Sequence, residues 1–257
     1  TTSASGKTTA TVLTGLVFAP RLHYFGRTDN LKSSALLPTL NIQFDSLHAY
    51  VSATSVFLSN PVQSLIYAGT VAETGYRFGN FNKFSGNIYL NKFFYNTTQL
   101  PQSALKEQAG INVSQHTKPI NFSAALSAAF SGERTDFFSS VGINRIFKKQ
   151  LKNAVLLITP TYVMNMGSQN FSTVQYKNNQ GADVAVIEKN RSFKILDHEI
   201  SVPVVYATKH VYLIATPSYI KPDSVVTIPA FPHLSEKAEK LFYVNFSALY
   251  TFKIKKK

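Results

Sequence analysis

The sequence of 257 residues contains no cysteine and no tryptophan. The lack of cysteine excludes a disulfide scaffold, a thiolate-ligated zinc or iron–sulfur site and a cysteine nucleophile. Charged residues make up 15% of the chain, compared with about 25% in an ordinary soluble domain. Apolar runs such as Ala154–Ile158 fall far below the ~18 residues that a membrane-spanning helix needs. The hydrophobic content of 44% still provides for a large core, which argues against intrinsic disorder.

The clearest positive signal is a period of two. The segments 36–44, 47–57, 120–130 and 242–254 alternate apolar with small polar residues. In the last of them one face consists of Phe242, Val244, Phe246, Ala248, Tyr250, Phe252 and Ile254. Segments of this kind, repeated along a chain, are the signature of a transmembrane β-barrel. A soluble β-sandwich with one wet face gives the same period and is the alternative.

Two features favour the membrane barrel. The polar face carries Asn, Ser, Thr and Gln rather than Lys and Glu, which suits a narrow and crowded lumen. Aromatic residues also gather near the segment ends, as the two interfacial girdles of a membrane barrel require. These aromatic residues are Phe18, Tyr24, Phe25, Phe93, Phe94, Tyr95, Phe137, Phe138, Phe242 and Tyr243.

The pattern predicts an all-β, antiparallel, up-and-down transmembrane barrel of about 12 strands, forming a single domain over residues 1–257. The predicted strands are 9–24, 34–44, 47–58, 64–75, 82–95, 103–114, 120–130, 137–147, 154–165, 193–206, 211–220 and 241–254. An even count returns both termini to one side, with short periplasmic turns there and longer extracellular loops opposite. The two longest loops are 166–192 and 221–240, and Ser235 is a candidate N-cap for a short helix in the second.

Several stretches spread over most of the chain carry a resemblance to a known group. They are Tyr24–Asp29, Ile158–Tyr162, Ile195–Val204, Ala215–Pro222 and the closing Phe242–Lys253. With these stretches the chain resembles the outer-membrane β-barrel proteins of Bacteroidota-type bacteria, most of which are uncharacterised. The resemblance implies the bacterial outer membrane and a mature chain whose signal peptide has been removed. One departure is the run Lys253-Ile-Lys-Lys-Lys after Phe252, because many such barrels end on an aromatic residue.

The alternation also predicts which polar side chains line the lumen. These candidates are Arg21, His23, Asn41, Gln43, Asn87, Asn91, Asn121, Asn144, Asp197, Glu199 and Asn245. Arg21 and His23 on one wall, with Asp197 and Glu199 on another, would form a constriction that selects solutes by charge. The alternative is an internal salt-bridge network that fills the lumen and stabilises the barrel.

Neither a metal, nor a cofactor, nor a catalytic site is expected. The six histidines include no pair at metal-ligand spacing. His48 and Ser52 share a predicted face, but Ser is abundant and no Gly-x-Ser-x-Gly motif accompanies them. An outer-membrane hydrolase is therefore the least favoured of the functions considered, and we expect a protein that is not an enzyme.

The formal net charge is +13, and the lysines sit at predicted turns and ends. They include Lys148, Lys149, Lys152, Lys237, Lys240 and Lys253. This placement predicts contact with anionic lipid headgroups and does not favour nucleic acid. The function expected is a narrow channel for small polar solutes. The alternative is a closed barrel that serves as an accessory or scaffold subunit in secretion, barrel assembly or nutrient uptake.

Overall fold

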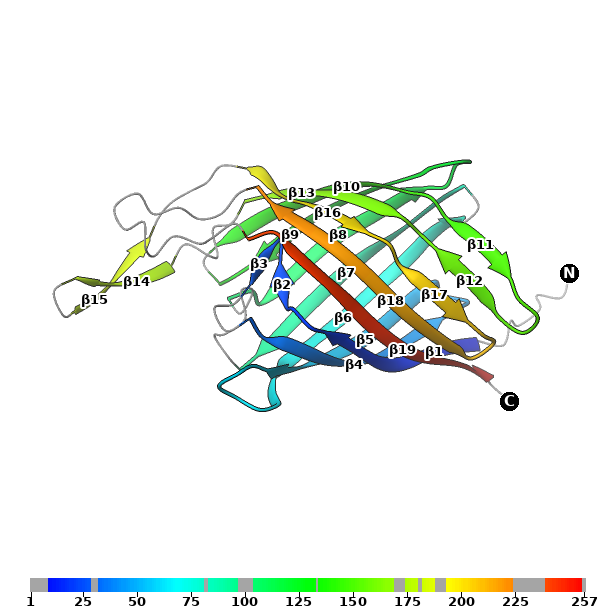
Figure 1. Cartoon of the computed structure of the whole chain (residues 1–257), viewed down its shortest axis with the longest axis horizontal. Helices are drawn as coiled ribbons and strands as arrows, with labels where there is room; N and C mark the ends of the chain where they lie inside the picture. The colour runs from blue at the N-terminus through cyan, green and yellow to red at the C-terminus, as the bar shows by residue number, and fades with distance from the viewer. Residues whose placement is uncertain are drawn as a thin grey trace, which may run out of the picture.

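The computed structural model describes residues 9–28, 32–80, 83–96, 104–132, 134–168, 174–179, 182–187, 193–223 and 239–255. Its main body is a closed antiparallel β-barrel of twelve spans (Figure 1). Nine spans are uninterrupted strands: β1 (Thr9–Ala19), β4 (Ser34–Phe44), β5 (Ala49–Ser59), β6 (Ile66–Asn80), β7 (Phe84–Tyr95), β8 (Glu107–Gln115), β9 (Asn121–Phe130), β18 (Val211–Pro222) and β19 (Leu241–Lys255).

Each of the other three spans consists of two strands. β10 (Thr135–Asn144) continues as β11 (Phe147–Gln150), β12 (Val155–Ile158) as β13 (Thr161–Gly167), and β16 (Lys194–Ser201) as β17 (Val204–Ala207). Two of the breaks contain a proline, Pro160 or Pro203, because proline has no N–H to give to the ladder. Their carbonyl oxygens still accept bonds from Arg145 N at 3.2 Å and Thr159 N at 3.0 Å. The wall therefore stays connected across the breaks.

Pairing of the first and last strands closes the barrel. The register runs from Thr9 opposite Lys255 to Phe18 opposite Phe246, and β1 pairs on its other side with β4. Closure removes both sheet edges, and with them the unpaired backbone groups that a bilayer could not solvate. None of the described residues forms a helix long and apolar enough to cross a membrane.

The two ends of the barrel differ, as the sequence predicts. Short turns near residues 45–48, 116–120, 151–154 and 208–210 lie at the end that also holds both termini (Figure 1); we call this the turn end. The longer connections lie at the opposite end, the loop end. One of them contains the hairpin of β14 (Val174–Asn179) and β15 (Ala182–Ile187). Most of the predicted loop 221–240, including the helix expected from Ser235, lies outside the described residues.

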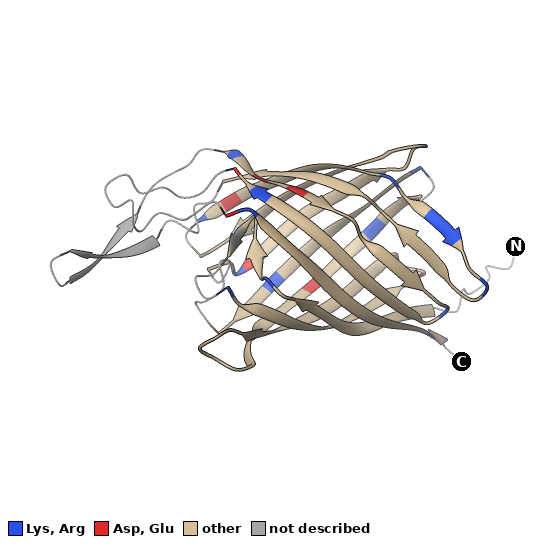
Figure 2. Ribbon diagram, viewed as in Figure 1, with Lys and Arg blue, Asp and Glu red and all other residues tan. Residues whose placement is uncertain are grey.

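Alternation along each strand gives the wall an apolar outer face. On β9, Phe122 is 53% exposed and Leu126 61%, whereas Ala129 on the opposite face is fully buried. Phe242, Phe246 and Ile254 are likewise exposed on β19. Lysine and arginine are sparse along the strands and are found mainly towards their ends (Figure 2). A closed sheet with this outer surface matches the hydrocarbon layer of a bilayer.

Two sequence predictions are wrong. One concerns the end of the first strand, and the other concerns which aromatic residues face outward. The first strand ends at Ala19 rather than residue 24, and His23–Tyr24 forms a separate strand, β2, paired with β3 (Arg27–Thr28). Only some of the predicted girdle aromatics face outward, among them Phe18, Phe94, Phe137 and Phe242. Tyr24, Phe25, Phe93, Phe138 and Tyr243 instead lie inside the barrel. Neighbouring residues on a strand point to opposite faces, so a cluster of consecutive aromatics cannot belong wholly to a girdle.

The outward face of β9 provides a test of membrane embedding. Leu126→Lys places a charge on the outer face at the middle of β9. This variant should destabilise the barrel by about 2–4 kcal/mol. The adjacent Ala125→Lys points to the lumen and should cost much less. Urea unfolding of the protein in phospholipid vesicles measures both. Equal losses for the two variants would show that the outer face does not contact hydrocarbon.

Candidate functional site

The turn-end half of the lumen contains a polar cavity of about 500 Å³. Its lining comes from the five consecutive strands β4 to β8. The residues are Asn41, Tyr50, Glu73, Arg77, Ser85, Gly86, Asn87, Asn112 and Ser114. Amides, hydroxyls and one pair of opposite charges are thus collected on one side of the barrel interior.

Tyr50 is the centre of this cavity. Its side chain is almost fully buried, and its ring lies over Gly75, where an added Cβ would come within 2.6 Å of the ring. The guanidinium carbon of Arg77 lies 5.0 Å from the ring centroid, within the range of a cation–π contact. The Tyr50 hydroxyl accepts a hydrogen bond from Asn87 Nδ2 at 3.0 Å, and the Glu73 carboxylate acts on it electrostatically. Tyr50 thereby separates the positive and negative groups of the cavity.

Further hydrogen bonds hold the polar groups in fixed positions. Arg77 donates to the side-chain oxygen of Gln43, and Asn112 Nδ2 donates to Asn87 Oδ1 at 3.2 Å. Ser85 is hydrogen-bonded to His116 at 2.9 Å. Each bond joins side chains on different elements, so the lining is set by the register of the barrel.

Other inward amides form similar cross-strand pairs. Asn121 Nδ2 donates to Asn144 Oδ1 at 2.8 Å, and Asn91 Nδ2 donates to Gln108 Oε1 at 3.4 Å. The side-chain oxygens of Asn91 and Asn245 are buried without a partner among the described residues. Buried polar atoms of this kind are usually bonded to ordered water, which is consistent with a hydrated interior.

Two acidic side chains from β16 also point inward. Asp197 is 1% exposed and accepts a hydrogen bond from Asn165 Nδ2 at 2.7 Å. Glu199 lies two residues further along β16, and the Asp197 carboxylate acts on it electrostatically. Ion pairs between described residues instead involve Lys32–Glu239, Lys92–Glu107, His198–Asp223 and Lys221–Asp223. Asp197 is thus held by a neutral amide donor rather than by a cation.

At the loop end of the lumen, apolar side chains pack in clusters beside buried polar residues such as Asp136 and Asp197. The β2–β3 hairpin lies within the barrel at this end (Figure 1), and Tyr24 and Phe25 pack on a cluster that includes Phe138 and Leu196. The Phe25 and Phe138 rings are stacked with centroids 4.9 Å apart. Phe25 has a φ of 51° and Gly26 a φ of 74°, so the turn places a bulky residue in the left-handed region. That conformation is unusual for phenylalanine, and packing against the wall stabilises it.

His23 connects this hairpin to β19, the strand beside β1. Its Nε2 is hydrogen-bonded to the Tyr243 hydroxyl at 2.7 Å, and its Nδ1 has no partner among the described residues. His23 belongs to β2, which is not one of the twelve barrel spans. Burial lowers the pKa of its ring to about 4. Glu199 acts electrostatically on the same tyrosine. A neutral imidazole therefore favours the docked hairpin.

The predicted lumen residues do not form one site. Asn41 and Asn87 line the turn-end cavity, and Gln43 holds its arginine. Asp197 and Glu199 lie on a different wall, and Asn121 pairs with Asn144. Arg21 does not join the acidic pair, because its strand has ended and its guanidinium donates to the Lys32 carbonyl at 2.9 Å. Arg21 thus bonds to a backbone carbonyl rather than to the two carboxylates, and the constriction stays a prediction.

Tyr50, Glu73 and Arg77 are not among the lumen residues predicted from the sequence. The predicted strand ended at residue 75, so Arg77 was assigned to a turn, whereas β6 extends to Asn80. Continued alternation through 73, 75 and 77 was the signal that could have found this pair.

The described part of the chain shows no metal cluster. It contains no group of three or more His, Asp or Glu side chains placed to hold a metal ion. His48 lies in the turn before β5, with its ring 6.3 Å from that of outward-facing Tyr76. Ser52 is on the lumen side of β5, so the two do not form a catalytic pair.

Comparison with known proteins gives distant likenesses. No family model matches the sequence, and no curated protein matches it. Among solved structures, a KdgM porin has a TM-score of 0.47 at 9% identity, with 94% of this chain and 98% of that chain covered. A bacterial polysaccharide outer membrane secretin has a TM-score of 0.46 at 8% identity, with 95% and 98% covered. LpxR from Salmonella typhimurium has a TM-score of 0.46 at 10% identity, with 95% and 99% covered. Likeness at this level carries no information about activity.

The His23 contact predicts that docking of the hairpin depends on pH. A free histidine has a pKa of 6.5 and the docked one a pKa of about 4, so the undocked state binds protons more readily. Docking is strongest above pH 6.5, weakens as the pH falls towards 4 and then levels off. Between pH 7.5 and pH 5 the docking equilibrium should fall roughly 30-fold. Amide exchange protection of residues 20–28, corrected for intrinsic rates, measures it. His23→Gln should remove the dependence; an unchanged slope in that variant would rule out His23 as its origin.

Proposed function

We propose that this protein is a narrow channel for small polar solutes in the bacterial outer membrane. The observation that carries the proposal is the cavity of about 500 Å³ around Tyr50, lined by amides, hydroxyls and one Arg–Glu pair. A cavity of that volume falls in the range of small-molecule sites, about 300–1,000 Å³. Side-chain groups that both donate and accept hydrogen bonds can replace the water around a neutral or zwitterionic solute.

The width of the barrel fits the same function. Twelve strands lie between filled eight-stranded barrels and open sixteen-stranded porins. Inward side chains therefore narrow such a lumen strongly. The apolar outer wall supports a membrane location, and antiparallel barrels of even strand number are the form of bacterial single-chain outer-membrane proteins.

The obstructed loop end favours a second candidate, a closed barrel that acts as a subunit of a larger assembly. Tyr24, Phe25 and Leu22 pack on apolar clusters of the wall, so the segment 22–25 obstructs the path of a solute through the loop end. The two functions differ in one property. The channel conducts at least transiently, whereas the closed barrel does not conduct even in isolation.

Conductance across planar bilayers separates these functions. The wild-type barrel should conduct in small, intermittent steps, because the hairpin obstructs the loop end. A variant in which residues 22–28 are replaced by a Gly-Ser linker of equal length should conduct several-fold more and remain open longer. A matched replacement of residues 60–65, which connect β5 to β6, should leave conductance unchanged. Absence of conductance from both the wild type and the 22–28 variant would overturn the channel and leave the closed barrel.

The charged pair of the cavity predicts opposite changes in ion selectivity. Glu73→Gln removes a lumenal negative charge and should shift the reversal potential in a salt gradient towards anion preference. Arg77→Gln should shift it towards cation preference, because the Glu73 carboxylate then remains unopposed. Asp45→Asn, in a turn at the same end, controls for charge outside the cavity. If neither cavity variant differs from this control, permeating ions do not pass beside Tyr50.

A further inference from the structure

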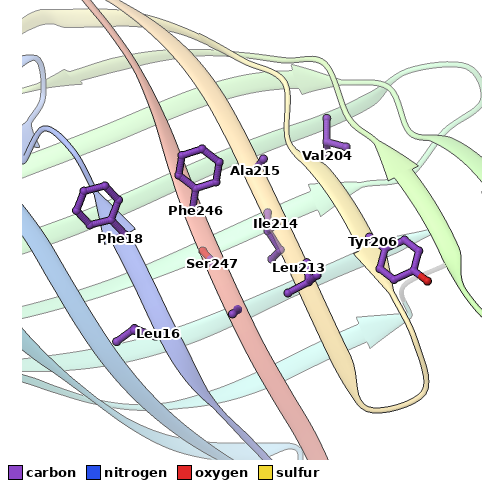
Figure 3. Close-up of a pocket in the computed structure, with 10 residues that line it drawn as sticks. Leu16, Phe18, Val204, Tyr206, Leu213, Ile214, Ala215, Phe246 and Ser247 are labelled. Carbon is purple, nitrogen blue, oxygen red and sulfur yellow. The ribbon is translucent and has the colours of Figure 1, made fainter.

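The outer wall carries an apolar groove of about 510 Å³ across β17, β18, β19 and β1. Its lining atoms are almost entirely apolar, and Figure 3 shows its side chains projecting from neighbouring strands. The groove lies on the face that meets hydrocarbon, on the opposite side of the wall from the lumen. Most of the outer wall is covered by large side chains, so the groove requires a local explanation.

Strand register explains how the groove forms. One row across the wall consists of Phe18, Phe246 and Ala215. The row beside it consists of Leu16, Ala248 and Leu213. Ala215 lies on β18 and Ala248 on β19, in adjacent rows. The two alanines therefore form a floor that runs diagonally across the two strands. Large side chains stand on both sides of that floor, as Figure 3 shows for Phe246 and Leu213.

Polar groups follow the groove along β18 and β19, towards the loop end of the barrel. Tyr219 lies opposite Phe242, and both are exposed on the outer face. Ile220 pairs with Leu241, so the continued register places Lys221 beside Lys240. Both lysines are exposed. The groove is thus followed along the wall by an aromatic pair and then by two ammonium groups.

The surroundings of these lysines leave room for an anion. Lys221 Nζ is 3.0 Å from Asp223 Oδ1, and that hydrogen bond lowers the pKa of the Asp223 carboxyl. The other carboxylate oxygen, Oδ2, is 2.9 Å from His198 Nε2, so Asp223 is engaged on both sides. Lysine has three donors, and the Lys221 side chain is 54% exposed. Lys240 adds a second positive charge beside it.

The separation of groove and lysines matches one lipid leaflet. Ala215 and Lys221 are six residues apart on β18, about 20 Å along a strand at ~3.4 Å per residue. With a tilt of about 40°, that length spans roughly 15 Å of depth. Half of a hydrocarbon core of about 30 Å is the same distance. A lipid whose headgroup meets the lysines therefore reaches the groove with its acyl chain.

We propose that the wall of β17, β18, β19 and β1 is a binding site for one anionic, phosphate-bearing lipid of the leaflet at the loop end. One acyl chain occupies the groove over Ala215 and Ala248, and the headgroup phosphate contacts Lys221 and Lys240. The site depends on the membrane location of the barrel and is independent of conduction through the lumen.

Native mass spectrometry of the full chain, released from nanodiscs of equal parts phosphatidylglycerol and phosphatidylcholine, tests this site. The wild type should retain one lipid per barrel, enriched in phosphatidylglycerol. Ala215→Phe with Ala248→Phe fills the groove and should lower lipid retention about tenfold. Ala124→Phe, an outward alanine on β9, is the matched control and should retain lipid like the wild type.

The headgroup contact is tested separately. Lys221→Gln with Lys240→Gln should abolish the preference for phosphatidylglycerol while a lipid is still retained. Lys92→Gln, at the loop end of β7, should keep the preference. The proposal is overturned if the filled-groove variant retains as much lipid as Ala124→Phe, or if the wild type retains both lipids equally. It is also overturned if the wild type appears as a dimer that the filled groove dissociates, because a second copy then covers the wall. Conductance should be the same in all these variants, so a failed channel and a failed lipid site give different results.

Discussion

Backbone hydrogen bonding around a closed ring is the constraint on which the rest of this structure depends. A bilayer offers no water to an unpaired N–H or C=O, so each span must find partners on both sides. Pairing of β1 with β19 meets this requirement at the seam. The prolines at the breaks between strands are tolerated because their carbonyl oxygens still accept bonds from the neighbouring span. The same wall can then face hydrocarbon on its outer side and water on its lumenal side.

Closure couples the two faces of every strand. Side chains alternate along each strand. The register that places Phe246 and Leu213 on the outer face therefore also fixes which side chains of β18 and β19 point into the lumen. The cavity around Tyr50 arises in this way from five consecutive strands. The same geometry produces the outer groove, because two alanines fall on adjacent strands in adjacent rows. Inner and outer candidate sites are therefore products of one register.

The lumen has two distinct parts, and this division shapes the proposed channel. Its turn-end half holds hydrogen-bonded amides and a charged pair, whereas the loop end holds the β2–β3 hairpin and apolar wall residues. His23 links the hairpin to Tyr243 through one hydrogen bond. The β2–β3 hairpin supplies none of the twelve spans. It can therefore move away from the loop end of the lumen without disturbing the wall. In the proposed channel, movement of this hairpin would then separate a conducting state from a closed one.

The amino-acid pattern alone predicts the barrel, its twelve spans, the short turns at one end and the outward face of strands such as 120–130 and 242–254. These features follow from a period of two, which is local and visible in one dimension. Contacts between distant parts of the chain set where the first strand stops, place Tyr24 and Phe25 inside the barrel and direct Arg21 to the Lys32 carbonyl. They also bring Glu73, Arg77 and Tyr50 together in one cavity. Alternation states which face a side chain occupies, but neighbours on that face are set by strand register and by loops that fold back. Both depend on contacts between residues far apart in the chain, and no local pattern records them.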